Sequence, residues 1–285
     1  MKLRRDFCVF IISYGRAKNI KTLTTLKRAK YTGPFFIVDS DDDDELAEYQ
    51  QLYGRKLHVF NKLEEAKSFD MMDNRQEASA SIVYARNYCF KLAKKLGYRY
   101  FLELDDDYNE FSFRHVKDND LKAKKITDIE PVFEATLQML DDTDALTIAW
   151  SQGGDLIGGI HGSNYKKRLL RKAMNSFFID TRKPFKFLGR INEDVNMYCD
   201  LGSRGQKIFQ VTDVMINQGS TQSADNGMTS LYLDYGTYLK SFYSVMIQPS
   251  FVKLNKMGIE NFRIHHNVDW NCAVPKIINQ KYKKA

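Results

Sequence analysis

Three consecutive aspartates, Asp105, Asp106 and Asp107, directly follow the apolar run Tyr100–Leu104, which we expect to form a buried strand. Neighbouring carboxylates repel one another, and a hard divalent cation such as Mg²⁺ or Mn²⁺ relieves that repulsion. In an extended chain Asp105 and Asp107 share one face, so both can serve one ion or its bound diphosphate. The carboxyl ends of strands are also where open α/β sheets bind ligands. The other interpretation is a capping cluster at a strand–loop junction.

Two other groups of polar residues accompany the aspartates. Arg86 stands in an Ala-Arg-Asn sequence on a helix predicted over residues 81–96, and its planar guanidinium suits a phosphate or a carboxylate. Glu193 and Asp194 open a second predicted helix, over residues 193–202. Because the helix dipole favours acids at an N-terminus, a capping role is the alternative to chemistry for these two.

The elements that must position these residues alternate between apolar strands and helices, which is typical of a mostly parallel sheet. Strands are predicted at residues 7–12, 34–39, 57–60, 100–104, 144–150, 176–179 and 207–212. Helices are predicted at residues 16–30, 41–53, 81–96, 129–140, 193–202 and 231–246. We expect a loop at the glycine-rich residues 153–162, and an irregular segment or short strand at residues 262–270. No linker divides the chain, so we expect a single domain over residues 1–285.

Composition narrows the class of protein. The 285 residues are 43% hydrophobic and include only five prolines, so the chain can bury a large core. No apolar run is long enough for a membrane span, and the run over residues 7–12 is too short for a signal peptide. The four cysteines lie far apart and form no CxxC pair, so we expect neither disulfides nor structural zinc, and a reducing cytoplasm fits.

The net charge of +7 is unevenly distributed along the chain. Residues 7–38 carry six Lys or Arg and no acid, and residues 162–190 carry nine against Asp180 alone. Either block can be an ordinary solvated face. Two such blocks in one chain favour a polyanionic partner, which can be a diphosphate, a nucleic acid or both.

The order of these motifs resembles that of GT-A glycosyltransferases over residues 7–212. A first strand ends in Ser-Tyr-Gly-Arg at residues 13–16, and a second ends at Asp39. The Ala-Arg-Asn helix, the aspartate strand and a late Glu-Asp…Gly…Ile helix follow in turn. The resemblance implies an α/β fold of GT-A, Rossmann-like type with a mixed, mostly parallel sheet flanked by helices. It also implies a nucleotide-sugar donor, usually a UDP-sugar, and Mn²⁺ or Mg²⁺. The acidic run that follows Asp39 departs from the family's pattern.

The resemblance assigns roles to individual residues. Residues 1–110 form the half for the nucleotide-sugar and metal, and residues 111–285 form the acceptor half with a C-terminal lid. The donor is contacted by Ser13, Tyr14, Arg16, Asp39, Arg86, Asp105 and Asp106. The metal is held by Asp105 and Asp107, with His265 or His266 as a late ligand. Either histidine can instead be a plain surface or core residue. Glu193 or Asp194 faces the acceptor, and in an inverting enzyme would take its proton as general base.

The chain also resembles a narrower group, the phage branch of the TET/JBP-associated glycosyltransferases. The residues behind this are FLELDDDY at 101–108, NSFFI at 175–179, and 190–194. The likeness implies a 5-hydroxymethylated pyrimidine of double-stranded DNA as acceptor, in the cytoplasm of a host cell. A base in a duplex must be turned out of the stack to be modified. The predicted phosphate contacts are Lys166, Lys167, Arg168, Arg171 and Lys172.

Three alternatives belong to other classes. A metal-dependent nuclease also uses acids, histidines and basic patches, although no nuclease motif is present. A sugar nucleotidyltransferase of related fold would consume a sugar phosphate and a nucleoside triphosphate. A non-catalytic nucleic-acid-binding module would use only the basic blocks. The sequence lacks a GxxxxGK[ST] loop, which argues against a P-loop NTPase.

Overall fold

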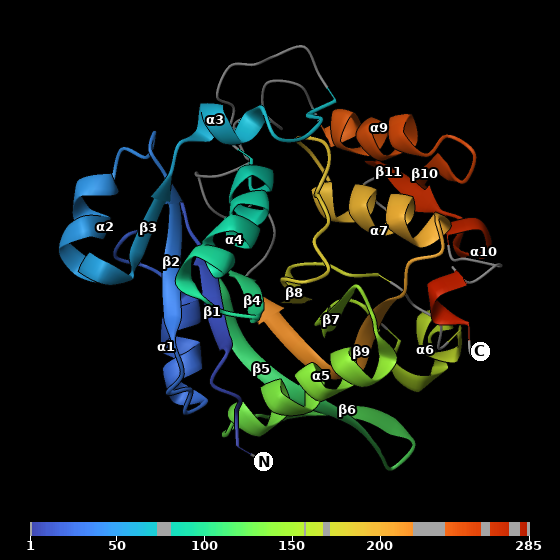
Figure 1. Cartoon of the computed structure of the whole chain (residues 1–285). Coiled ribbons are helices and arrows are strands. Elements are labelled where there is room, and N and C mark those ends of the chain that lie inside the picture. The colour runs from blue at the N-terminus through green and yellow to red at the C-terminus, as the bar shows by residue number, and fades with distance from the viewer. Residues whose placement is uncertain are drawn as a thin grey trace.

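The protein is built around one large sheet that takes strands from both halves of the chain (Figure 1). The computed structural model describes residues 2–72, 81–156, 158–167, 172–218, 237–257, 263–273 and 280–283. Within this part of the chain, nine strands form one sheet in the order β3-β2-β1-β4-β8-β7-β9-β5-β6, and β10 and β11 form a separate pair. The expected fold class, a mixed sheet flanked by helices, is confirmed.

The strands and helices have the following bounds. The strands are β1 Phe7–Ile12, β2 Phe35–Ser40, β3 Leu57–Phe60, β4 Tyr100–Asp105, β5 Tyr108–Lys117, β6 Asp120–Lys125, β7 Thr147–Gln152, β8 Ser176–Asp180, β9 Ile208–Gln218, β10 Val252–Met257 and β11 Arg263–Val268. The α-helices are α1 Lys21–Arg28, α2 Leu46–Tyr53, α3 Lys62–Ala66, α4 Val83–Leu96, α5 Glu130–Thr143, α6 Ser163–Lys167, α7 Glu193–Ser203, α9 Thr237–Ile247 and α10 Trp270–Ala273. Three short 3₁₀ helices are η1 Gly54–Lys56, η2 Gly159–His161 and η3 Gln280–Tyr282.

The parallel part of the sheet brings the predicted site residues to one edge. Strand β1 lies between β2 and β4 and runs parallel to both. All six of its residues are buried, as a continuous apolar run requires in a strand covered on both faces. The carboxyl ends of these three strands therefore meet at one edge, where Ser13, Asp39 and Asp105 lie. Strand β7 also runs parallel to β9, whereas β4–β8, β7–β8, β5–β9 and β5–β6 are antiparallel pairs.

Helices cover both faces of the sheet (Figure 1). On one face, α4 and α7 pack over a core that includes Phe10 of β1 and Phe101 of β4. On the other face, α1 and α5 pack over a core that includes Val9 and Leu102 of the same two strands. No helix in the described ranges is long and apolar enough to cross a bilayer. All four cysteines are free.

Several predicted boundaries are wrong for a common physical reason. The helix expected over residues 16–30 begins at Lys21, and the one expected over 41–53 begins at Leu46. The turns between β1 and α1 and between β2 and α2 bind each other instead. The Gly15 amide donates to Asp43 Oδ2 at 2.6 Å, and the Ala17 amide donates to Glu45 Oε2 at 2.7 Å. Acids expected inside a helix thus serve as acceptors for a neighbouring loop.

The later elements need fewer corrections. The strand predicted to end at residue 212 continues to Gln218, because its second half pairs with the unpredicted strand β5. Residues 263–268 form a strand paired with β10, and the expected loop at 153–162 contains η2. Of the helix expected over residues 231–246, residues 231–236 lie outside the described residues, and the remainder forms α9.

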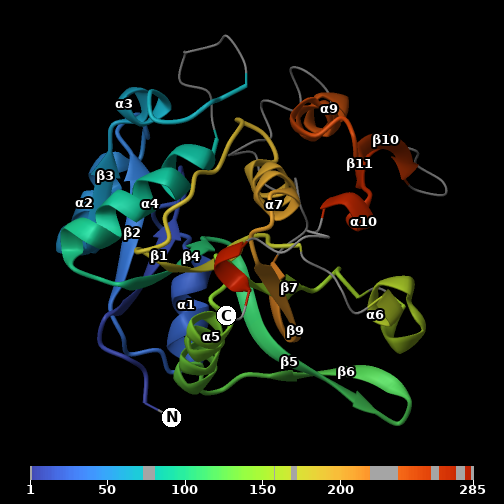
Figure 2. The ribbon, with the colours of Figure 1, turned by 45° about the vertical axis from the view of Figure 1, so that its right-hand side comes forward.

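The largest omission from the sequence-based prediction is the β5–β6 hairpin, which projects beyond α5 in both views (Figures 1 and 2). Lys117 pairs with Asp120, so Asp118 and Asn119 form a two-residue turn. Both have positive φ, 52° and 56°, as the tight turn of a twisted hairpin requires. Strand β6 carries no apolar alternation because most of its residues are exposed.

Candidate active site

Asp106 ties the first loop of the sheet to the end of β4. Its Oδ2 accepts a hydrogen bond from Ser13 Oγ at 2.7 Å, and its Oδ1 accepts one from Arg16 Nη1 at 2.7 Å. Ser13 Oγ also lies 2.6 Å from Tyr49 Oη, and the Arg16 amide donates to the same tyrosine oxygen. Burial raises the pKa of Asp106 above its usual value even though Arg16 opposes the shift. Two of the predicted donor-binding residues are therefore fixed by one buried aspartate.

Asp107 has no such partner. Its Oδ1 is buried and accepts no hydrogen bond from any residue that the structure describes. Burial, and then the charges of Asp105 and Asp106, raise the pKa of Asp107 to about 6. A buried acceptor without a donor costs free energy that a cation can recover. Of the three aspartates, Asp107 is thus the one whose surroundings call for a ligand.

Arg86 connects three carboxylates on two different elements. Its side chain is 1% exposed, and its Nη2 lies 3.0 Å from Asp105 Oδ1. Its Nε lies 3.0 Å from Glu193 Oε1, and its Nη1 lies 3.5 Å from Glu103 Oε2. The guanidinium also lies over the ring of Phe177, 4.9 Å from its centroid. Arg86 therefore binds protein carboxylates, whereas the prediction was that it contacts the donor.

Glu193 and Asp194 form an adjacent pair of buried acids at the start of α7. The side chain of Glu193 is held by Arg86, whereas Oδ1 of Asp194 accepts a hydrogen bond from the amide of Val195 at 2.7 Å. Burial is the main cause that raises the pKa of each acid above its usual value. The charge of Asp194 raises the pKa of Glu193 further, while Arg86 opposes the shift in both. Raised pKa values bring carboxyl groups into the range where they accept and release protons near neutral pH.

Asp39 and Tyr14 lie at the neighbouring strand ends. Asp39 Oδ1 accepts the Ser40 amide at 2.8 Å, and its Oδ2 is buried with no hydrogen-bond partner in the described part of the chain. Burial, followed by the charge of Asp43, raises the pKa of Asp39 to about 8. Tyr14 is partly exposed, and its hydroxyl donates to the carbonyl oxygen of Asp42 at 3.3 Å. Tyr14 is therefore accessible at this edge, whereas Asp39 lies buried beneath it.

His266 lies near the start of α7. Its Nδ1 lies 3.4 Å from Asn192 Nδ2, and its ring centroid lies 4.3 Å from that of His265. Burial, and then the charges of His265 and Lys240, lower the pKa of His266 to about 3, so its imidazole is neutral. No three His, Cys, Asp or Glu side chains converge on a metal position within the described ranges. Neither histidine therefore completes a ready three-ligand site with the aspartates.

The predicted DNA-binding block is only partly described. Lys166 is exposed on the short helix α6, and Lys167 is described only for its backbone. Arg168 and Arg171 lie outside the described residues altogether. Lys172 forms an ion pair with the buried Asp155, with 2.7 Å between Nζ and Oδ1. Its charge also lowers the pKa of Asp194, so it belongs to the surroundings of α7.

Three residues of the site were missed from the sequence. Glu103 is fully buried, and burial raises its pKa to about 8 although Arg86 opposes the shift. The sequence did indicate it, because Glu103 is the one charged residue in the apolar run at residues 100–104. Nothing in the sequence indicated a role for Tyr49 and Asp43, because the mostly polar residues around them are typical of an exposed segment.

The match to known families covers most of this site. Residues 7–227 match the family described as TET-Associated Glycosyltransferase. That range contains every predicted site residue except His265 and His266. No curated protein matches the sequence.

Several solved structures are similar to this chain at low identity. Glucosyl-3-phosphoglycerate synthase from Mycobacterium tuberculosis, in complex with Mn²⁺, UDP-glucose and phosphoglyceric acid, is 12% identical over 91% of this chain and 86% of that chain, with a TM-score of 0.49. The same synthase in complex with Mg²⁺ and UDP is 11% identical over 93% and 88%, with a TM-score of 0.47. Galactosyltransferase LgtC, in complex with donor and acceptor sugar analogs, is 15% identical over 62% and 58%, with a TM-score of 0.34. All of these similarities are distant.

Proposed function

Because the chain belongs to the TET-associated glycosyltransferase family and is therefore a glycosyltransferase, we propose that it transfers a sugar from a nucleotide-sugar to a hydroxyl group of DNA. The proposed donor is a UDP-sugar, and the proposed acceptor is a 5-hydroxymethylated pyrimidine in double-stranded DNA. The observation that carries this proposal is the buried, unpartnered carboxylate oxygen of Asp107 at the end of β4. Asp107 lies two residues from Asp105, which Arg86 links to Glu193 of α7.

The carboxylates at the end of β4 fit a divalent cation. Asp107 offers a buried oxygen that has no donor within the described ranges, and Asp105 lies two residues before it in the same run of acids. Oxygen ligands of this kind suit Mg²⁺ or Mn²⁺, and the phosphate oxygens of a donor complete the coordination of such ions. When bound, the cation neutralises charge on the leaving diphosphate. His265 and His266 remain candidate late ligands that would have to approach from β11.

The residues of this chain divide the remaining work. We assign the nucleoside contact to Asp39 and Tyr14. Asp106 holds the nearby Ser13 and Arg16 through hydrogen bonds. In the transfer, the acceptor hydroxyl forms a bond to the anomeric carbon, and the bond from that carbon to the diphosphate oxygen breaks. In an inverting reaction the hydroxyl proton goes to a carboxylate of α7. We propose Asp194 as that base, because Arg86 already holds Glu193.

The direct test is to incubate the protein with labelled UDP-sugars, Mn²⁺ and duplex DNA that carries 5-hydroxymethylated pyrimidines. We expect release of UDP together with label in the DNA, and neither product from Asp194→Asn or after chelation of the metal. Unmodified DNA of the same sequence is the matched acceptor control. DNA cleavage without sugar transfer would identify a nuclease instead, and pyrophosphate release from a nucleoside triphosphate would identify a nucleotidyltransferase.

A further inference from the structure

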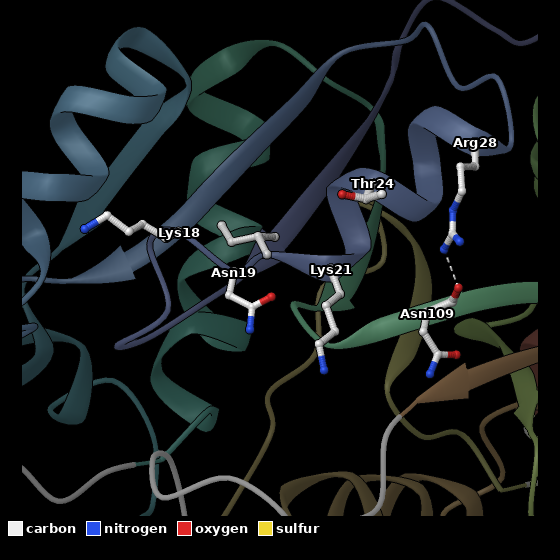
Figure 3. A pocket seen from close by; sticks show the side chains of 7 residues that line it. Lys18, Asn19, Lys21, Thr24, Arg28 and Asn109 are labelled. Carbon is white, nitrogen blue, oxygen red and sulfur yellow. Dashed lines mark hydrogen bonds between the residues drawn. The ribbon is translucent and has the colours of Figure 1, made fainter.

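The outer side of α1 carries a cationic pocket that the proposed site does not use. The pocket has a volume of about 200 Å³ and extends along α1 as far as Arg28, beside the start of β5 (Figure 3). Its polar lining consists of Lys18, Asn19, Lys21, Thr24, Arg28 and Asn109. Three of these side chains are cationic, and no carboxylate lines the pocket. Such a lining fits a phosphate group.

The cations of the pocket differ in how firmly they are held. Arg28 Nη2 donates to the carbonyl oxygen of Asn109 at 2.5 Å, which fixes the guanidinium over β5 while other donors remain. Lys18 pairs with Glu48, but its side chain is 77% exposed, and such surface pairs contribute little. Lys21 makes no ion pair with any residue in the described ranges. A phosphate can therefore recruit Lys21 without breaking an existing contact.

The β5–β6 hairpin continues the same face of the sheet. Phe111 of β5 packs into the core beneath α1 and α5, so by strand alternation Phe113 and His115 point to that side as well. Their partners across the hairpin are Lys124 and Lys122. Beyond the helices this face is open to solvent, and Phe113 is 40% exposed. An exposed aromatic ring between cations is typical of surfaces that bind nucleic acids.

The acid at the start of β6, Asp120, does not block this face. Asp120 pairs with Lys122, with 2.7 Å between Oδ2 and Nζ, and both side chains are at least half exposed. An exposed pair of this kind contributes little free energy, so a phosphate can replace the carboxylate. Lys124 has no acidic partner among the described residues.

The length of this surface decides between small and large anions. Strand β5 rises by roughly 3.3 Å per residue, so Asn109 and His115 lie roughly 20 Å apart along it. One strand of a DNA duplex presents a phosphate about every 3.4 Å of helix axis, so this distance matches several successive phosphates. A single diphosphate cannot reach both ends.

The surface also adjoins the carboxylate edge. Thr22, next to Lys21, donates from Oγ1 to the carbonyl oxygen of Asp105 at 2.6 Å. The Thr22 hydroxyl oxygen, Oγ1, in turn accepts a hydrogen bond from the amide of Tyr108 at 3.0 Å. The first residues of α1 are therefore fixed directly to the turn that holds the aspartates.

We propose that the α1 pocket and the adjoining face of the β5–β6 hairpin form one surface that binds the phosphate backbone of the DNA acceptor. This proposal rests on the proposed function, because it names the surface that brings the acceptor to the aspartates. The proposed surface is separate from the predicted DNA-binding block at residues 166–172. A two-stranded ribbon such as β5–β6 is also narrow enough to enter a DNA major groove.

The test compares two double variants with the same change of charge. Lys21→Glu with Lys124→Glu alters the proposed surface. Lys27→Glu with Lys125→Glu is the control, because Lys27 lies on α1 outside the pocket and Lys125 lies on the other face of β6. Binding of a fluorescent DNA duplex is measured across a salt series. We expect the first variant to lose affinity and to lower the slope of log K against log salt by about two, and the control to keep the parental slope.

Two further measurements, UDP release without acceptor and displacement of DNA by UDP, distinguish failure of this surface from failure of the proposed function. UDP release without acceptor should be the same in both variants, and UDP should not displace the DNA. Equal DNA binding by the two variants, or competitive displacement by UDP, would overturn the proposed surface while leaving sugar transfer intact. The surface proposal also fails if the parent releases UDP but binds no DNA. If the parent binds DNA through this surface and never glycosylates it, the surface stands and the proposed acceptor is wrong.

Discussion

Arg86 Nε lies 3.0 Å from Glu193 Oε1, so one guanidinium joins the start of α7 to the end of β4. The same group lies 3.0 Å from Asp105 Oδ1 through its Nη2. The proposed metal side and the proposed acceptor side of the reaction therefore share one buried cation. A shift of α7 would therefore displace Arg86 and with it Asp105, and a shift of β4 would displace Glu193 in the same way.

The first prediction concerns Arg86→Lys. Lysine keeps the positive charge but has a single nitrogen, which cannot contact both Asp105 and Glu193 in the geometry of a planar guanidinium. We expect the fold to persist and transfer to fall roughly 10–100-fold, as is usual when the outer partner of a metal ligand is changed. Turnover with a UDP-sugar, measured beside the circular dichroism spectrum, gives the result.

Arg86→Met is the structural control for that experiment. It leaves three carboxylates without their shared cation, which destabilises a buried network by roughly 3–5 kcal/mol. Urea unfolding should therefore separate the two variants clearly. An Arg86→Lys protein with full activity would show that the bridge between α7 and β4 does not position the reacting groups.

The second prediction contrasts two neighbouring aspartates. Asp107→Ala removes a carboxylate whose buried Oδ1 has no hydrogen-bond donor among the described residues, so the stability should stay close to that of the parent and metal-dependent transfer should be lost. Asp106→Ala removes the acceptor of Ser13 and Arg16, and should destabilise the fold by roughly 1–3 kcal/mol. Thermal unfolding and turnover are measured for both. Normal turnover by a folded Asp107→Ala protein would contradict the metal assignment.

The third prediction uses the pKa of Asp39, which burial raises to about 8. The folded protein therefore binds this proton more tightly than the unfolded chain, in which the pKa is near 3.8. The stabilising effect of the bound proton is complete below the unfolded value and is lost as the pH rises through the folded value. We expect the free energy of unfolding in urea to fall between about pH 4 and about pH 8, by at most about 1.4 kcal/mol per pH unit for this group. Asp39→Asn, which cannot ionise, should flatten that slope, and an unchanged slope would show that Asp39 is ionised in the fold.

The parallel part of the fold could be predicted because its signals are local. The run at residues 7–12 is apolar throughout, and a strand of this kind must be covered on both faces, as β1 is. The helix predicted to end at residue 96 does end there, and Gly97 caps it in the left-handed region. The aspartate run was correctly placed at the end of β4 for the same reason, since the apolar residues before it define the strand.

The parts that were missed depend on contacts between distant segments. Nothing near Arg86 in the sequence shows that Glu193 lies beside it, because 107 residues separate the two. The hairpin was missed because β6 gains its place from pairing with β5 and buries few side chains. Asp118 and Asn119 are residue types that tolerate the positive φ of a tight turn. In the sequence they did not indicate a hairpin, because the residues of β6 that follow them show no apolar alternation.

The last prediction separates two lysines that the sequence placed in one DNA-binding block. Lys166 is exposed, so Lys166→Glu should lower the salt slope of DNA binding by about one and leave stability unchanged. Lys172 instead pairs with the buried Asp155 and lowers the pKa of Asp194. Lys172→Met should therefore keep the parental salt slope, reduce stability, and move the rise of transfer rate with pH to higher pH, because Asp194 holds its proton more tightly. Anisotropy titrations with duplex DNA, urea unfolding and a pH–rate profile distinguish the two variants. A salt slope reduced equally by both changes would place Lys172 against the DNA and remove it from the surroundings of Asp194.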